Sequence, residues 1–400
     1  MFLSSTEYLN EIRLSITNSD YSLASRRILD FLYDYNLTHH QALKELSYQI
    51  RKDYLDKSAS QTNADAIQHQ LYQQWLDAVT NISITENEAL HPNDMVVFEA
   101  TELSKVFASK ARNFTLYPLD VKLQLGELTA VVGENGNGKT TLLRLIAGEL
   151  AVSTGNVRYF NKPVSDWYAL KNKIAYIPQR PDRWYGTLMD NLNFYCSING
   201  LFNEVNEDYV NYILHRLGLF QFRNLKWTEI SSGYRLRFEL AKALMMRPKL
   251  LVLDEPLANL DINAQQLFLQ DLKYLAHSSK HPMAVVLSSQ QLHELERNCK
   301  NVVFIKQGKT IYSGEQQQFA SNRNTNAFEV GGSFTITQLQ EWLQSIGDVK
   351  ISDSGTVFII NTPLTVQSQD ILKVITENKV PINYFRDISK STRQLFQKDI

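Results

Sequence analysis

Cysteine is scarce in this chain of 400 residues, which contains only Cys196 and Cys299. Two cysteines so far apart cannot form the disulfide framework of a secreted domain or a zinc cluster, and we expect a reducing compartment. Glycine and proline are also few, at 16 and 10 residues, while 44% of the residues are hydrophobic. This composition excludes collagen-like and largely disordered proteins and favours a globular protein with more than one domain.

An excess of charge of either sign is also missing, since 41 Lys and Arg residues face 42 Asp and Glu residues. The sequence therefore lacks the bulk basic surface of a non-specific nucleic-acid binder, and we expect no nucleic-acid partner. The longest apolar runs, at 250–253 and 284–287, fall far short of the ~20 residues that cross a bilayer. The first residues also lack the pattern of a signal peptide, so we expect an intracellular protein whose membrane role is peripheral.

Three segments with different patterns follow one another. Residues 1–94 carry apolar residues at helical spacing, such as Ala24, Ile28 and Phe31, and predict an N-terminal helical domain. Residues 95–320 alternate helical segments with strands at 128–132, 173–177, 250–253, 283–287 and 302–305, which predicts an α/β domain with a largely parallel sheet.

Residues 321–400 predict a small C-terminal α+β domain of strand, helix, two strands around Gly355, helix and strand, followed by a last helix at 392–398. We expect its first two helices at 338–345 and 366–377, the first with a capping box of Thr337 and Gln340.

One glycine-rich run predicts a site for nucleotide phosphates. It reads Gly133-Glu134-Asn135-Gly136-Asn137-Gly138-Lys139-Thr140 and satisfies G-x-x-x-x-G-K-[ST] between a strand and a helix that continues with Thr141. The glycines let backbone N–H groups surround phosphates at the positive end of that helix. We expect Lys139 to reach the β- and γ-phosphates and the Thr140 hydroxyl to bind Mg²⁺.

Two adjacent carboxylates, Asp254 and Glu255, end the apolar strand at 250–253. Because successive strand residues point to opposite faces, the two carboxylates cannot share one role. One of them should hold Mg²⁺, usually through water, and the other should polarise the attacking water.

The order of these motifs resembles the nucleotide-binding domain of ABC-type ATPases. Further segments carry the resemblance: Gln179 resembles the Q-loop glutamine, Ser231-Ser232-Gly233-Tyr234 the signature motif, and Asp261 the D-loop aspartate. Gln290 lies where the family has its switch histidine. Phe107 resembles the A-loop aromatic that stacks on adenine, with Phe114 and Tyr117 as competitors.

The resemblance implies a P-loop NTPase of ABC type that binds ATP and Mg²⁺. The phosphate loop and Phe107 would bind ATP, while Thr140, Gln179 and Asp254 would hold the metal. Glu255, Gln290 and Gln179 would serve catalysis. The family also implies a dimer, in which the signature of one copy meets ATP on another, and a separate membrane permease. We expect an export-type subunit in the cytoplasm, peripheral to the inner face of the cell membrane.

Two motifs depart from the family pattern. The signature has Ser232 where glycine is usual and Tyr234 where glutamine is common, and Gln290 replaces the histidine, with His293 as a substitute one turn on. Two alternatives therefore stay open: a soluble ABC ATPase that acts on ribosomes or DNA, and a slow nucleotide-gated switch. A final prediction concerns Arg183, Trp184 and Tyr185, which follow Gln179 closely: they form either an exposed anchor for a permease helix or part of the packing within the helical subdomain.

Overall fold

The structure is a computed structural model that describes residues 4–60, 65–84, 95–109, 112–163, 167–200, 203–290, 295, 298–316, 318 and 325–389. Its central element is a six-stranded sheet in the order β10-β9-β3-β8-β7-β6. The strands are β3 (Leu128–Val132), β6 (Ile174–Ile177), β7 (Leu250–Leu253), β8 (Ala284–Ser289), β9 (Asn301–Lys306) and β10 (Lys309–Glu315). All neighbours pair in parallel except β9 and β10, which confirms the largely parallel sheet.

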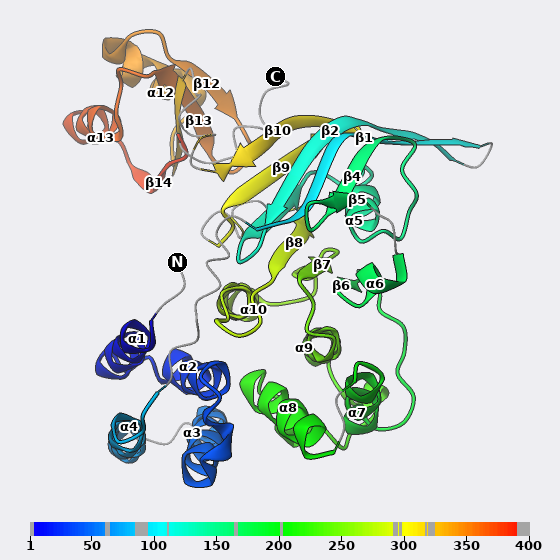
Figure 1. The fold of residues 1–400 in the computed structure, drawn as a ribbon. Helices are drawn as coiled ribbons and strands as arrows, with labels where there is room; N and C mark the ends of the chain where they lie inside the picture. The colour runs from blue at the N-terminus through cyan, green and yellow to red at the C-terminus, as the bar shows by residue number, and fades with distance from the viewer. Residues whose placement is uncertain are drawn as a thin grey trace.

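Both faces of this sheet are covered, as the continuous apolar runs of its strands require. On β3, Leu128, Ala130 and Val132 join one buried cluster, whereas Val131 joins the cluster on the other face. The second face carries α5 (Lys139–Ile146) and an antiparallel sheet in the order β2-β1-β4-β5. This sheet consists of β1 (Val96–Ser109), β2 (Arg112–Gln124), β4 (Thr154–Tyr159) and β5 (Lys162–Pro163), and β1 and β2 form the long hairpin of Figure 1.

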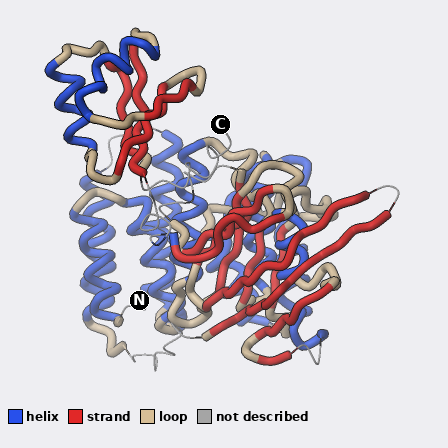
Figure 2. Tube along the Cα trace, turned by 90° about the horizontal axis from the view of Figure 1, so that it is seen from above, coloured by secondary structure: helices blue, strands red, loops and turns tan. Residues whose placement is uncertain are grey.

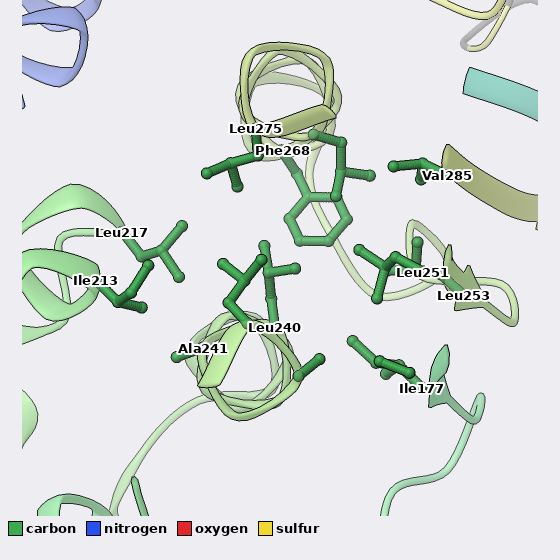
Figure 3. Close-up of a cluster of buried hydrophobic side chains, with 14 of the residues drawn as sticks. Ile177, Ile213, Leu217, Leu240, Ala241, Leu251, Leu253, Phe268, Leu275 and Val285 are labelled. Atoms are coloured by element: carbon green, nitrogen blue, oxygen red, sulfur yellow. The ribbon is translucent and has the colours of Figure 1, made fainter. Parts of the chain in front are cut away.

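The first face carries α10 (Ile262–Ala276) and a helical arm inserted between β6 and β7. The arm consists of α7 (Leu188–Ile198), α8 (Asn203–Arg216), the short helices η3 (Phe220–Phe222) and η4 (Trp227–Glu229), and α9 (Ser232–Met245). The short helix α6 (Trp167–Lys171) precedes β6. Figure 3 shows Leu217, directly after α8, converging with Leu240 of α9, Phe268 of α10 and Leu251 of β7 in one buried cluster.

The N-terminal segment forms a bundle of α1 (Ser5–Thr17), α2 (Tyr21–Asp34), α3 (Gln41–Ser60) and α4 (Asp65–Thr80), with η1 (Leu37–His39) between α2 and α3. Its own core includes Ile12, Ile28, Phe31 and Trp75. The other side of α2 lies against the arm, and Figure 1 shows α2 beside α8 and α10. Leu29 and Tyr33 of α2 belong to the main buried cluster of the α/β domain.

The C-terminal unit stands to one side of the molecule in Figures 1 and 2. Its elements are β11 (Thr325–Gly332), α12 (Ile336–Leu343), η6 (Gln344–Ile346), β12 (Lys350–Asp353), β13 (Phe358–Pro363), α13 (Ser368–Glu377) and β14 (Ile382–Asp387). The sheet order β12-β13-β11-β14, with every pair antiparallel, is a ferredoxin-like split βαβ arrangement.

The predicted capping box of α12 is wrong by two residues. Thr335 caps the helix and Gln338 returns the bond, because T-x-x-Q occurs at both registers and the helix starts at Ile336. The helix predicted at 392–398 lies outside the described residues. No described helix is long and apolar enough to cross a membrane.

Candidate functional site

The glycine-rich loop between β3 and α5 forms an open cradle at the carboxyl end of the sheet. Gly133, Gly136 and Gly138 have φ angles of 155°, 81° and 106°. A Cβ at Gly133 would lie 2.3 Å from the carbonyl oxygen of Ile305, so a side chain is excluded there. Gly138 precedes α5 and offers no side-chain cap, which leaves the N–H groups of the first turn for a ligand. The cradle therefore fits an anion such as a nucleotide phosphate.

Lys139 lies inside this cradle and is 4% exposed. Its ammonium donates to the carbonyl oxygens of Gly133 and Glu134 at 2.8 and 3.2 Å, and lies 3.0 Å from Oε1 of Glu255. The Glu255 carboxylate is the anion that neutralises the buried ammonium. A phosphate that binds here must take its place.

The Glu255 carboxylate also accepts hydrogen bonds from the two glutamines that the sequence predicts for the site. Gln179, after β6, and Gln290, after β8, donate from Nε2 to Oε2 of Glu255 at 3.0 and 2.9 Å. The backbone of Glu255 has a φ of 46°, a conformation that residues other than glycine rarely adopt and that is found at functional sites. The three residues thus form one hydrogen-bonded group with Lys139.

Asp254 lies beside this group but faces a different partner. Its Oδ1 accepts from the Ser288 hydroxyl at 2.7 Å, and the same hydroxyl accepts from the backbone N–H of Glu255 at 2.8 Å. Burial, and next the nearby Asp254 carboxylate, raise the pKa of Tyr176. Ser288 was missed by the sequence analysis, although its position directly before the Ser289-Gln290 pair at the end of β8 was a signal for it.

The oxygen donors around the cradle suit Mg²⁺. Thr140 presents its hydroxyl at the start of α5 and is exposed, while the Asp254 carboxylate and the Gln179 amide lie at the same edge of the sheet. Hydroxyl, carboxylate and amide oxygens, completed by phosphate and water, are ligands that Mg²⁺ accepts. Among the described residues, there is no group of three or more His, Cys, Asp or Glu side chains that could hold a metal ion.

The remaining loop residues have different surroundings. Glu134 and Asn135 are exposed, and Thr141 is buried in α5. The side chain of Asn137 accepts from the backbone N–H of Gln307 at 3.0 Å, so it ties the loop to the turn between β9 and β10.

Of the aromatic candidates for adenine, Phe114 lies against the loop, because a Cβ on Gly138 would lie 2.8 Å from its ring. Phe107 is paired with Phe114 across the β1–β2 hairpin, and the Lys105 ammonium lies 5.4 Å from the centre of its ring. Tyr117 is 44% exposed.

The signature-like segment and Asp261 lie together around a second cavity of about 310 Å³. Ser231 caps α9 by accepting from the N–H of Tyr234 at 3.4 Å, and Asp261 caps α10 in the same way through Ala264. Ser231 and Ser232 are exposed, and Gly233 faces Leu260. The residues that line this cavity come from α9, α10 and the segment before α10, and none comes from the phosphate loop.

Comparison with known proteins agrees with this arrangement. The profile of the ABC transporter family matches residues 116–258. An uncharacterised ABC transporter ATP-binding protein of Bacillus subtilis, YxlF, is 32% identical over 220 residues, which cover 54% of this chain and 70% of that protein. The chain belongs to the ABC transporter ATP-binding proteins. It is therefore an ABC transporter ATPase and the ATP-binding subunit of a transporter.

One further relative and one solved structure also match this ATPase. The Nod factor export ATP-binding protein I of Rhizobium etli is 29% identical to this ATPase over 225 residues, which cover 55% of the chain and 68% of that protein. The structure of cbiO1 from Clostridium perfringens, part of the ABC transporter complex cbiONQ, has a TM-score of 0.51 at 23% identity, and the match covers 64% of this chain and 98% of that one. This second match supports the P-loop NTPase fold.

One residue of the predicted permease anchor is not exposed. Trp184 is 7% exposed, stacks on Trp227 at 5.1 Å and donates to Glu239 at 2.6 Å, so it is part of the arm's core and not of an exposed anchor. Tyr185 is 81% exposed, with the Arg183 guanidinium 5.8 Å from its ring. His293 lies outside the described residues.

Proposed function

We propose that two copies of this ATPase close around ATP, each copy presenting its phosphate loop to one nucleotide and its signature segment to the other. The observation that carries the proposal is the separation of the two halves of the site. Lys139, Glu255, Gln179 and Gln290 form one connected group, while Ser231 lines a different cavity of the same chain. A C2-symmetric dimer would bring each half against the other half of its partner.

In this site Lys139 would bind the β- and γ-phosphates after leaving Glu255. The freed Glu255 carboxylate would accept the proton of the attacking water, and Gln179 and Gln290 would hold that carboxylate in place. Thr140, Asp254 and Gln179 would hold Mg²⁺, which neutralises phosphate charge when bound. The N–H groups of Ser232 and Gly233 at the start of α9 would face the γ-phosphate of the partner's ATP.

We further infer that the ATPase drives export through a separate permease. The relative named as a Nod factor exporter supports this direction, although the proteins matched include importers as well. Exposed apolar side chains after Gln179 in the chain give the permease a surface to contact: Tyr185, and Phe194 and Ile198 one turn apart on α7, which are 61% and 60% exposed. Asn191 of α7 donates to the carbonyl oxygen of Tyr185 at 2.7 Å and so holds this surface together.

Complementation between two inactive variants tests the dimer. Lys139→Ala removes the phosphate-binding cation and Ser231→Arg blocks the signature side, so each protein alone should hydrolyse no ATP. Mixed dimers contain one intact site, and an equal mixture should recover about a quarter of wild-type turnover if subunits exchange at random. Lys139→Ala alone, at the total protein concentration of the mixture, is the matched control. A mixture that stays inactive at concentrations where wild type is dimeric would refute the shared site.

Gln290 favours one second candidate, a slow nucleotide-gated switch. Glutamine offers a neutral N–H donor, whereas histidine can carry a positive charge. Phosphate release at saturating ATP separates the two functions, because a transporter motor needs turnover that its permease accelerates. A turnover that a co-purified permease leaves unchanged would favour the switch.

A further inference from the structure

A buried chain of charged groups joins three parts of the molecule: the N-terminal bundle, the arm and the α/β core. Arg216, at the end of α8, donates to Oδ1 of Asp30 in α2 at 2.5 Å and to Oδ1 of Asp271 in α10 at 2.6 Å. Arg26 of α2 donates to the same Asp271 oxygen at 2.6 Å. All four side chains are at most 8% exposed. Burial alone would raise the pKa of Asp271, but Arg216 and Arg26 outweigh it and lower this pKa to about 2.

Other contacts fasten the bundle to both neighbours. On the arm side, Arg51 of α3 donates to the carbonyl oxygens of His215 and Arg216, the last two residues of α8, at 3.2 and 3.4 Å. On the core side, Asp34 accepts from the hydroxyl of Ser278 and the N–H of Ser279, just after α10, at 2.7 and 3.1 Å. The bundle thus binds the arm and the core at the same time.

These contacts lie on elements that lead to the signature segment. The chain runs from α8 through η3 and η4 to Ser231, and Arg237 of α9 donates back to the carbonyl oxygen of Leu217 at 3.4 Å. On the core side, α10 begins at its cap Asp261, which shares the second cavity with Ser231. A shift of α8 against α10 would therefore displace Ser231 relative to the core that carries the phosphate loop.

The apolar cluster of Figure 3 holds the arm to the core, but apolar contact is non-directional and tolerates sliding. Charge-assisted hydrogen bonds are short and directional. Buried ion pairs often contribute little net stability compared with apolar residues of the same size, and their better attested use is to fix register. The charged network is therefore in a position to fix how α8 lies along α10.

We propose that Arg26, Asp30, Arg216 and Asp271 form a positioning brace, through which the N-terminal bundle fixes the arm so that Ser231 meets ATP bound to a second copy. This inference rests on the proposed role of Ser231 in the dimer. It gives the bundle a function inside the ATPase: the bundle sets the geometry of the site without touching the nucleotide.

The test uses the full chain in a Glu255→Gln background, in which ATP should trap a dimer visible by light scattering. Adding Arg26→Gln and Asp271→Asn removes one charge of each sign, cuts the link from α2 to α10 and leaves the Arg216–Asp30 pair in place. The matched control, Glu127→Gln with Lys300→Gln, removes an ion pair within the α/β domain, between a largely buried carboxylate and a half-exposed ammonium. ADP affinity by calorimetry reports on the phosphate loop alone, since ADP lacks the γ-phosphate.

We expect the brace variant to bind ADP within about twofold of the parent while needing roughly 10-fold more ATP for half-maximal dimerisation, and the control to change neither. Equal dimerisation of brace variant and parent would overturn the brace, as would a parallel loss of ADP affinity, which would indicate general damage to the fold. If the double variant does not fold, Arg26→Gln alone should show the same split at smaller size, and its lack would overturn the inference. A parent that stays monomeric with ATP would instead refute the proposed dimer.

Discussion

Replacing Glu255 by glutamine should tighten the binding of ADP as well as stop hydrolysis. The Lys139 ammonium lies 3.0 Å from the Glu255 carboxylate, and both side chains are almost fully buried. The introduced amide has one oxygen, which can accept from Gln179 and Gln290 as the carboxylate does. Its NH₂ group then faces the ammonium, where two donors meet, so Lys139 loses its charged partner before the nucleotide arrives.

The size of the effect follows from the bond that ADP no longer has to break. A hydrogen bond to a charged group contributes about 1.5–3 kcal/mol, and the glutamine offers Lys139 no bond in its place. Losing this contribution corresponds to roughly 10- to 150-fold tighter binding of ADP. Hydrolysis should stop, because an amide cannot accept the proton of the attacking water.

Calorimetry with ADP measures this effect without dimer formation, because ADP brings no γ-phosphate to the signature of a second copy. Gln290→Ala is the control, since it removes a donor to the far oxygen of Glu255 and leaves the Lys139 contact as it is. ADP affinity that is unchanged or weaker in Glu255→Gln would show that Glu255 does not compete with the phosphates for Lys139.

Other variants test neighbouring parts of the argument. Lys139→Ala should abolish ADP and ATP binding by calorimetry, because no other described cation is shown inside the cradle; unchanged affinity would exclude the loop as the phosphate site. Gln290→His should raise turnover roughly 5- to 30-fold and add a pH dependence near 6.5, while Gln290→Ala should lower turnover; alanine and glutamine with equal turnover would make Gln290 a spectator. Burial raises the pKa of Asp34 to about 6, so the folded state binds its proton more tightly and this residue makes the free energy of unfolding fall as pH rises from about 4 to 6. Asp34→Asn should remove that fall, which amounts to up to about 3 kcal/mol between the two ends of the pH range. Denaturant titrations of variant and wild type at a series of pH values measure it. Curves of unfolding free energy against pH that run parallel for the two proteins would contradict the prediction.

The phosphate loop and the strand that ends at Asp254 could be predicted because their signals are local. A glycine pattern between a strand and a helix, and an apolar run followed by carboxylates, each lie within a few consecutive residues. The strand predicted at 250–253 matches β7 for the same reason.

The contacts of α2 could not be predicted in this way. Arg26 and Asp30 have the spacing of a solvated helix face, and their partner Asp271 lies 245 residues from Arg26 in the sequence. Trp184 shows the opposite error: beside Arg183 and Tyr185 it reads as exposed, yet its partners Trp227 and Glu239 come from later in the arm. The left-handed backbone conformation of Glu255 could not be predicted from its residue type, because glutamate has no particular preference for that conformation.

The sharing of a core between α2 and the ATPase has a consequence during synthesis on the ribosome. The bundle leaves the ribosome first, but Leu29, Tyr33 and Arg26 reach their final surroundings only when α8 and α10 have followed. At about 5–20 residues per second, Arg26 waits roughly 12–50 seconds for Asp271. Until then the nascent bundle displays an apolar and charged face, which makes it a natural target for chaperones. A chain that stalls before residue 271 should be recognised and degraded rather than accumulate as a folded fragment.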